Sequence, residues 1–151
     1  MDVFEMLKQD HRKVDGLFKQ LEPAGDASTR RQLFTQLKQE LDLHAQVEET
    51  ILYPALKESP KTQDITEEAY EEHGEVKQLL AQLQQTPPSD GRFDELLAEL
   101  RAGVEHHVEE EEGEMFVKAR EVLSAQQLEE ITRRVEEAKQ QAPKASGAGG
   151  A

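Results

Sequence analysis

Apolar residues recur every three or four positions along most of the chain, which is the period of one face of an α-helix. Breaks rich in proline, glycine and serine divide this pattern, and no stretch has the pattern of a β-strand. The predicted helices span about residues 2–22, 28–57, 61–85, 91–121 and 124–141. Four long helices with short connections predict an all-α, up-down-up-down four-helix bundle, with a short C-terminal fifth helix packed outside it.

Local signals refine the ends of these helices. Pro54 lies within the second one, and because the apolar pattern continues beyond it we expect a kink there rather than an end. Ser124, with Gln127 three positions later, predicts a capped start for the last helix. We expect one domain over residues 1–141 and a low-complexity, disordered tail over residues 142–151.

Polar groups interrupt the apolar face of the second helix. His44 and Glu48 lie one helical turn apart, on the face that Leu37, Leu41 and Leu52 otherwise make apolar. Imidazole and carboxylate groups are rarely buried without a partner, because the loss of their water costs several kcal/mol. Either this helix carries an isolated polar defect, or the core of the bundle binds something through these side chains.

An internal repeat decides between these alternatives. The first and third helices share a single histidine followed by the same spacing of apolar residues, and the second and fourth share a His-x-x-x-Glu pair. A repeated helical hairpin that closes on itself turns both copies toward one axis. The repeat therefore delivers six polar side chains to a single core, and they are His11, His44, Glu48, His73, His107 and Glu111.

A metal site accounts for this set of side chains. Hydrogen bonds alone do not satisfy four imidazoles and two carboxylates in a dry core, whereas two divalent or trivalent cations would. The two glutamates could each bridge such a pair of cations. The structural alternative is a bundle without metal, which the number of buried ligand groups disfavours. Imidazole and carboxylate ligands suit iron, manganese and zinc alike, so the spacing does not choose the metal.

These motifs resemble those of the hemerythrin-like, HHE cation-binding family. The matching residues are Asp10-His11, His44-x-x-x-Glu48-Glu49-x-x-Leu52-Tyr53-Pro54, Glu72-His73 and His107-x-x-x-Glu111-Glu112-x-x-Met115-Phe116. The resemblance covers about residues 1–120 and implies a four-helix bundle around a non-haem di-iron centre, with two iron ions joined by an oxo or hydroxo bridge. It also implies terminal imidazole ligands at His11, His44, His73 and His107, and bridging carboxylates at Glu48 and Glu111.

Two departures from the oxygen-carrying hemerythrins change what the resemblance implies. Those carriers have a second histidine four residues from the third-helix histidine, where this chain has Ala69 and Lys77. They also have an aspartate five residues after the fourth-helix histidine, whereas this chain has Glu111 four residues after it. The metals are then less saturated, and Glu72 or Glu49 is a conceivable further donor. Open positions favour sensing or chemistry over reversible oxygen carriage.

Several neighbours of the predicted ligands have simpler interpretations. His106 adjoins His107 but points about 100° away round the helix, so we interpret it as a surface residue or an outer neighbour of the site. Tyr70 is interpreted as ordinary packing, with a role as proton or electron donor as the alternative. Asp10 and Glu72 are interpreted as exposed acids, with hydrogen bonds to ligand histidines as the alternative. Three residues are interpreted as core positions, and the resemblance implies that they wall the site; they are Tyr53, Met115 and Phe116.

Composition limits the partners that we expect. The 151 residues include 32 acidic and 18 basic ones, and the formal net charge of −14 disfavours nucleic acid and anionic membranes. No apolar run is long enough to span a membrane, and no cysteine is present to supply a disulfide, a thiolate ligand or a nucleophile. The acidic N-terminus lacks the features of a secretory signal, and we expect a cytoplasmic protein.

Two classes of function remain open, and neither assigns a catalytic residue. In the first, the protein binds oxygen, nitric oxide or peroxide at the di-iron centre and serves in sensing oxygen, nitric oxide or iron, or in a stress response. In the second, it is a redox enzyme that consumes peroxide, as catalases and peroxidases do, or that repairs oxidative damage. A sensor of this size would act through a partner protein, and an enzyme could use a redox partner.

Overall fold

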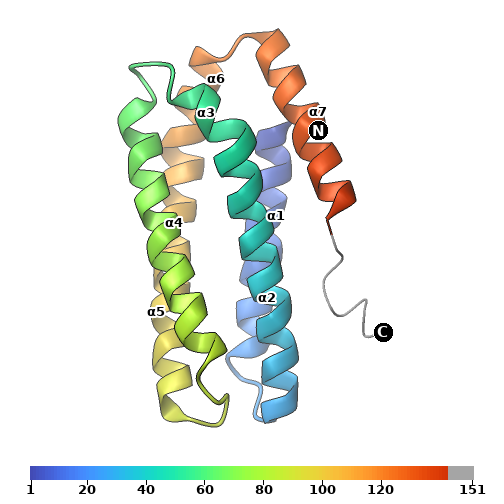
Figure 1. The fold of residues 1–151 in the computed structure, drawn as a ribbon, viewed down its shortest axis with the longest axis vertical. Helices are drawn as coiled ribbons and strands as arrows, with labels where there is room; N and C mark the ends of the chain where they lie inside the picture. The colour runs from blue at the N-terminus through green and yellow to red at the C-terminus, as the bar shows by residue number, and fades with distance from the viewer. Residues whose placement is uncertain (143–151) are drawn as a thin grey trace.

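The computed structural model describes residues 1–142, and these form helices joined by short connections with no strand among them (Figure 1). The helices are α1 (Val3–Leu21), α2 (Ala27–Val47), η1 (Glu48–Leu52), α3 (Tyr53–Leu56), α4 (Gln63–Gln84), α5 (Gly91–Glu110), η2 (Glu111–Met115), α6 (Phe116–Val122) and α7 (Ala125–Gln141). The all-α prediction is confirmed. Apart from Ala142, the residues of the predicted disordered tail lie outside the described part of the chain.

The bundle consists of four long rods that run side by side in alternating directions (Figure 1). The second rod is α2 continued by η1 and α3, and the fourth is α5 continued by η2 and α6. Helix α7 lies along the outside of the bundle near the N-terminus, as predicted for the fifth helix. Within the described residues, no helix is both long and apolar enough to cross a membrane.

Capping side chains set where several helices begin. Asp2 accepts from the backbone N–H of Glu5 and so starts α1, while Asp26 accepts from the N–H of Thr29 at the start of α2. Ser124 and Gln127 form the predicted capping box at the start of α7. These caps satisfy backbone donors that a helix cannot pair internally, which fixes the register of the helices and of the side chains they carry.

The kink that we expected at Pro54 is a π-helical turn that precedes the proline. In η1 the backbone N–H of Tyr53 donates to the carbonyl of Glu48, five residues earlier. The matching turn η2 joins Phe116 to Glu111 in the same way, although no proline follows there. Proline is therefore not the common cause. Both π-turns begin at a predicted bridging glutamate, and such turns are frequent at functional sites.

Two apolar clusters fill the bundle, and a polar layer separates them. One cluster, near the ends where α3 and α6 lie, is built around Phe4, Leu52 and Phe116. The other, near the connection between α4 and α5, is built around Phe18 and Phe34. Between the two clusters lie the buried polar residues of the predicted site, which are His11, His44, Glu48, His73, His107 and Glu111.

Candidate metal centre

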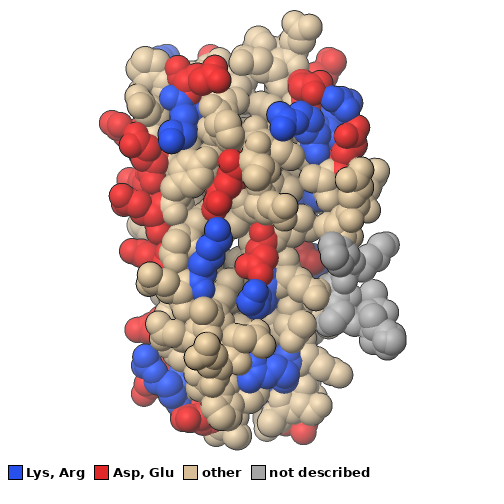
Figure 2. Space-filling model, in the orientation of Figure 1, with Lys and Arg blue, Asp and Glu red and all other residues tan. Residues whose placement is uncertain are grey.

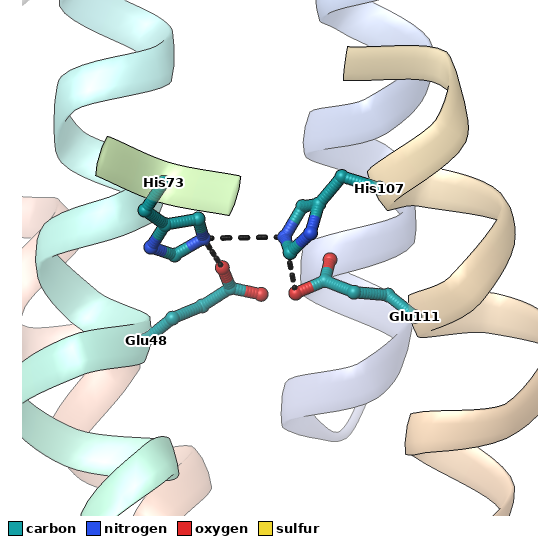
Figure 3. Close-up of side chains that lie close together, drawn as sticks. All are labelled: Glu48, His73, His107 and Glu111. Atoms are coloured by element: carbon teal, nitrogen blue, oxygen red, sulfur yellow. Dashed lines mark hydrogen bonds and ion pairs between the residues drawn. The ribbon is translucent and has the colours of Figure 1, made fainter. Parts of the chain in front are cut away.

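All six predicted ligands converge in the polar layer. The four rods supply one histidine each, and the two glutamates are the first residues of η1 and η2. The exposed fraction is 6–8% for each histidine and 0% for each glutamate. Figure 3 shows two of the imidazoles facing the two carboxylates across the core, and the four side chains drawn there are Glu48, His73, His107 and Glu111.

Glu48 connects two helices through its two carboxylate oxygens. Its Oε1 lies 3.1 Å from His73 Nε2, and its Oε2 lies 3.2 Å from His44 Nε2. The two histidines belong to α4 and α2, so one carboxylate contacts both halves of the repeat. This is the arrangement needed for a carboxylate that bridges two cations.

Glu111 has the corresponding arrangement from the opposite side. Its Oε1 lies 2.9 Å from His11 Nε2, and its Oε2 lies 3.1 Å from His107 Nε2. His107 Nε2 also lies 3.2 Å from His73 Nε2, so two imidazoles converge on one point. The donor atoms fall into two overlapping groups, each within 4.8 Å, which are Glu48 with His73, His107 and Glu111, and His11 with His44 and Glu111.

Two buried atoms at the centre have no hydrogen-bond partner. They are His44 Nε2 and Glu48 Oε2, which lie 3.2 Å apart without the geometry of a hydrogen bond. A buried polar atom left unpaired costs about 1–3 kcal/mol, so native proteins rarely leave one. Both atoms are ligand atoms that iron, manganese and zinc accept, and a cation between them would satisfy both. The donor set therefore fits a bound metal ion.

A ring of four carboxylates holds the outer nitrogens of the four histidines. The Nδ1–carboxylate distances are 2.6 Å for His11–Glu112, 2.9 Å for His44–Asp10, 2.7 Å for His73–Glu49 and 2.5 Å for His107–Glu72. Each bond fixes the orientation of its ring, with Nδ1 as the donor and Nε2 directed at the centre. Carboxylates in this position are typical of metal-binding histidines, because they orient the ring and raise its basicity.

The interpretation of Asp10 and Glu72 as exposed acids was wrong. Their side chains are 12% and 15% exposed, and each accepts a hydrogen bond from a histidine on the next helix. Glu49, which we considered as a further metal donor together with Glu72, holds His73 from outside instead. A signal was present in the sequence, since each of the four acids directly adjoins a predicted ligand. In a chain with 32 acidic residues, however, such adjacency carries little information.

Tyr53 takes part in the polar layer in a way that the sequence analysis missed. Its hydroxyl lies 2.8 Å from Glu111 Oε2 and 3.0 Å from Glu48 Oε1, and it can donate its hydrogen to either carboxylate. Phe116 stands at the matching position of the repeat. The two rings stack on matching histidines, with Tyr53 on His73 and Phe116 on His11. The signal for this role was the tyrosine–phenylalanine difference between the two copies.

The outer neighbours behave as expected. His106 is a surface residue, because its side chain is 63% exposed. Its Nε2 lies 3.5 Å from Glu72 Oε2, outside the six inner residues. Tyr70 packs edge-on against the Tyr53 ring, with 5.2 Å between the ring centroids. Its hydroxyl donates to the backbone carbonyl of Glu49 at 3.3 Å, so it does not reach the six inner residues.

Electrostatics in the layer depend on the charges that face one another. Burial alone would lower the pKa of His44, but the Glu48 carboxylate and the hydrogen bond to Asp10 raise this pKa well above its usual value. At His107, burial alone would also lower the pKa, but the Glu111 carboxylate raises it above its usual value. The His107 charge in turn holds the pKa of Glu111 well below its usual range, against the effect of burial. Metal binding would therefore displace protons from the histidines.

A small apolar cavity lies against the four histidines on the side of the Phe18–Phe34 cluster. Its volume is about 40 Å³, and its apolar lining comes from Val14, Leu41, Val76, Leu80, Val104 and Val108. The lining also includes Asp42 of α2 and Lys77 of α4, whose side chains are 44% and 56% exposed, so the cavity approaches the surface between these helices. Figure 2 shows the molecule from the side of α2 and α4, where acidic and basic side chains lie close together.

Known proteins share this sequence pattern and fold. The family model described as the Hemerythrin HHE cation binding domain matches residues 2–119. A crystal structure from Mycobacterium kansasii, described as an HHE cation binding domain-containing protein and a homolog of Rv2633c, has a TM-score of 0.81. It is 29% identical in sequence, and the alignment covers 93% of this chain and 86% of that chain.

Curated relatives differ in length from this chain. The uncharacterised protein Rv2633c of Mycobacterium tuberculosis is 31% identical over 117 residues, which are 77% of this chain and 71% of that protein. A protein named DNA nickase from Nostoc sp. is 34% identical over 130 residues, which are 86% of this chain but 37% of that protein. The nickase name thus describes a protein of which this chain spans little more than a third. By its family match and its fold, the chain belongs to the hemerythrin HHE cation-binding family.

Proposed function

We propose that this protein holds a non-haem di-iron centre in the polar layer of the bundle. The terminal ligands would be the Nε2 atoms of the four inner histidines, and the two glutamates would bridge the metals. The observation that carries this proposal is that each glutamate directs its two oxygens to histidines from different halves of the repeat. The six residues in question are His11, His44, Glu48, His73, His107 and Glu111.

The ligand count leaves room for an exogenous ligand. Ala69, which lies one turn before His73 and is 2% exposed, contributes no donor where oxygen carriers have a histidine. Bound iron would supply exchangeable coordination positions and redox chemistry. The protein's own contribution is to orient the imidazoles through their Nδ1 bonds and to keep bulk water out of the layer.

The cavity supports a small ligand. A water molecule needs about 10–15 Å³ of cavity volume, so about 40 Å³ has room for a diatomic molecule or hydrogen peroxide. The lining is mostly apolar and also includes Lys77 and the four histidines. Oxygen, nitric oxide and hydrogen peroxide fit these limits. We propose a role in sensing one of them, or in a stress response, through a partner protein.

Consumption of peroxide is the second candidate, and Tyr53 is the observation that favours it. Its hydroxyl lies 2.8 Å from Glu111 Oε2, which places a mobile hydrogen beside the bridging carboxylates. Peroxide reduction needs protons in a site that excludes water, and a buried phenol can hold one there. A redox partner would then be required unless peroxide serves as both oxidant and reductant.

Two measurements on the iron-loaded protein separate these candidates. Charge-transfer absorption that shifts on addition of azide or nitric oxide would demonstrate an open position, whereas an unchanged spectrum would contradict ligand binding. Steady turnover of hydrogen peroxide, lost in His44→Ala and kept in His106→Ala, would select the enzyme. A protein that binds nitric oxide or oxygen but leaves peroxide unreacted would select the sensor. Circular dichroism of both variants checks that the helices remain folded.

A further inference from the structure

A lysine of the fifth helix binds the carboxylate that holds one of the proposed ligands. Lys139 Nζ lies 2.5 Å from Asp10 Oδ1, and the other oxygen of that carboxylate lies 2.9 Å from His44 Nδ1. The three side chains form one hydrogen-bonded chain from α7, through α1, to α2. The Lys139 side chain is only 23% exposed, so solvent screens this ion pair less than a pair on the open surface.

Helix α7 is anchored independently of this lysine. The Val3 backbone N–H donates to Thr132 Oγ1 at 3.1 Å, and Ile131 and Val135 are buried in the cluster around Phe4. Lys139 lies in the last turn of α7, beyond these anchors. Figure 1 shows α7 following the outside of the bundle from the N-terminal end of α1. The direction of the helix, set by its apolar face, therefore carries the ammonium to Asp10.

The contact distinguishes Asp10 from the matching acid of the repeat. Glu72 occupies the same place in the second hairpin and holds His107 in the same way. Among the ion pairs of residues 1–142, however, Glu72 pairs with histidines and with no lysine or arginine. The repeat contains no second copy of α7. The fifth helix thus makes the two histidine pairs unequal.

We propose that Lys139 is a positioning residue for the cation bound by His11 and His44. This inference rests on the proposed metal centre. By binding Oδ1, the ammonium holds the Asp10 carboxylate against His44 and keeps Nε2 aimed at the centre. Helix α7 is accordingly part of the metal site, and the two metal positions differ in affinity.

Cobalt(II) titration of the metal-free full chain tests this proposal, because the absorption of bound cobalt reports its coordination. Two binding steps are expected in the wild-type protein. Asp10→Asn should weaken one step by about 10–100-fold, the usual effect of losing a carboxylate that orients a ligand histidine. Lys139→Met should weaken that same step by a smaller factor, about 3–10-fold, and Lys139→Arg should restore it. Equal weakening of both steps, or of neither, would overturn the proposal.

A matched control removes the same charge elsewhere. Lys118 forms an ion pair with Glu114 on the surface, and its side chain is 40% exposed. Lys118→Met should leave both cobalt steps unchanged. If it weakens the same step as Lys139→Met, the effect is one of net charge and the proposed contact is not its cause.

Hydrogen exchange distinguishes a positioning role of Lys139 from a purely structural one. If Lys139 couples α7 to the site, cobalt should slow amide exchange over 125–141 in the wild-type protein and not in Lys139→Met. Equal slowing in both proteins would overturn the coupling. A wild-type protein that binds no cobalt would instead overturn the proposed metal centre. If both cobalt-binding steps are present in the wild-type protein and unchanged in Lys139→Met, only the inference about Lys139 is overturned.

Discussion

At the scale of single residues, the two halves of the site differ by one hydroxyl group. Tyr53 and Phe116 each lie five residues after a predicted bridging glutamate, and both stack on a histidine. Only Tyr53 places a donor between the carboxylates, 2.8 Å from Glu111 Oε2. Burial, and then the charges of both glutamates, raise the pKa of Tyr53 well above its usual value, so the phenol keeps its hydrogen in the metal-free protein.

Tyr53→Phe tests how much that hydroxyl contributes to the stability of the fold. Hydrogen bonds to charged groups contribute about 1.5–3 kcal/mol, and we expect the free energy of unfolding of the metal-free protein to fall by that amount. Tyr70→Phe is the matched control, because the Tyr70 hydroxyl makes one long bond of 3.3 Å and should cost less than about 1 kcal/mol. Urea unfolding in the presence of a chelator measures both. Equal losses would contradict the assigned role of Tyr53.

Sequence reasoning assigned the six inner residues to one core because the repeat supplies a second copy of each pattern. The structure brings these residues together, and their role as metal ligands stays a prediction. For the outer ring, hydrogen bonds from Asp10 and Glu72 to ligand histidines were only the alternative interpretation, because acids are abundant and an acid beside a ligand resembles any surface acid. Tyr53 was missed for a different reason. A tyrosine on an apolar face is usually core, and only the folded chain shows which way its hydroxyl points.

At the scale of elements, a buried arginine ties α2 to the connection between α4 and α5. Arg30 is 7% exposed, donates to the carbonyl of Pro88 at 2.7 Å and pairs with Asp94. Its guanidinium also lies over the Phe93 ring, 4.9 Å from the centroid. The two hairpins of the repeat are thereby joined at the end of the bundle away from α7.

Arg30→Met should lower the free energy of unfolding by about 1.5–3 kcal/mol, because a charge-assisted bond to a partly buried carbonyl is lost while the apolar stem is kept. Arg92→Met is the control. Arg92 makes an exposed ion pair with Glu95 within one helix, which contributes about 0.5 kcal/mol or less. Denaturant unfolding of both variants gives the comparison. A loss for Arg30→Met no larger than that for Arg92→Met would show that the hairpins are not joined through this residue.

Helix number and order were predictable, whereas the π-turns were not. Leu52 and Met115 are buried four residues after Glu48 and Glu111, so the apolar spacing in the sequence stays helical and does not reveal the wider turns. Proline indicated an irregularity in the second rod, and the fourth rod has the same turn without it. What the two turns share is a buried glutamate at their first residue.

At the scale of the whole molecule, buried charge makes the stability of the metal-free protein depend on pH in an uncommon direction. The pKa of His44 and of His107 is raised in the folded state, while unfolded histidine titrates near 6.5. The stabilisation is complete below pH 6.5 and is lost as the pH rises toward the folded pKa. Glu111, whose pKa is depressed, acts oppositely, and its contribution is lost as the pH falls below about 4.5.

We therefore expect the free energy of unfolding of the metal-free protein to decrease between pH 6.5 and 8.5. Each histidine that stays protonated in the folded state contributes at most about 1.4 kcal/mol per pH unit to this slope. The cobalt-loaded protein should show the reverse trend, because cations bind deprotonated imidazoles. Urea unfolding across this range, with chelator or with cobalt, measures both trends. His106→Gln should leave them unchanged, and a metal-free protein that gains stability with pH would contradict the assigned protonation.

The number of iron atoms bound per chain tests the central claim most directly. Metal-free protein would be reconstituted with iron(II) without oxygen, freed of excess metal and analysed for iron and protein. Two irons per chain are expected for the wild-type protein and for Glu109→Ala, and one or fewer for Glu111→Ala. A wild-type protein that retains less than one iron per chain would contradict the di-iron centre.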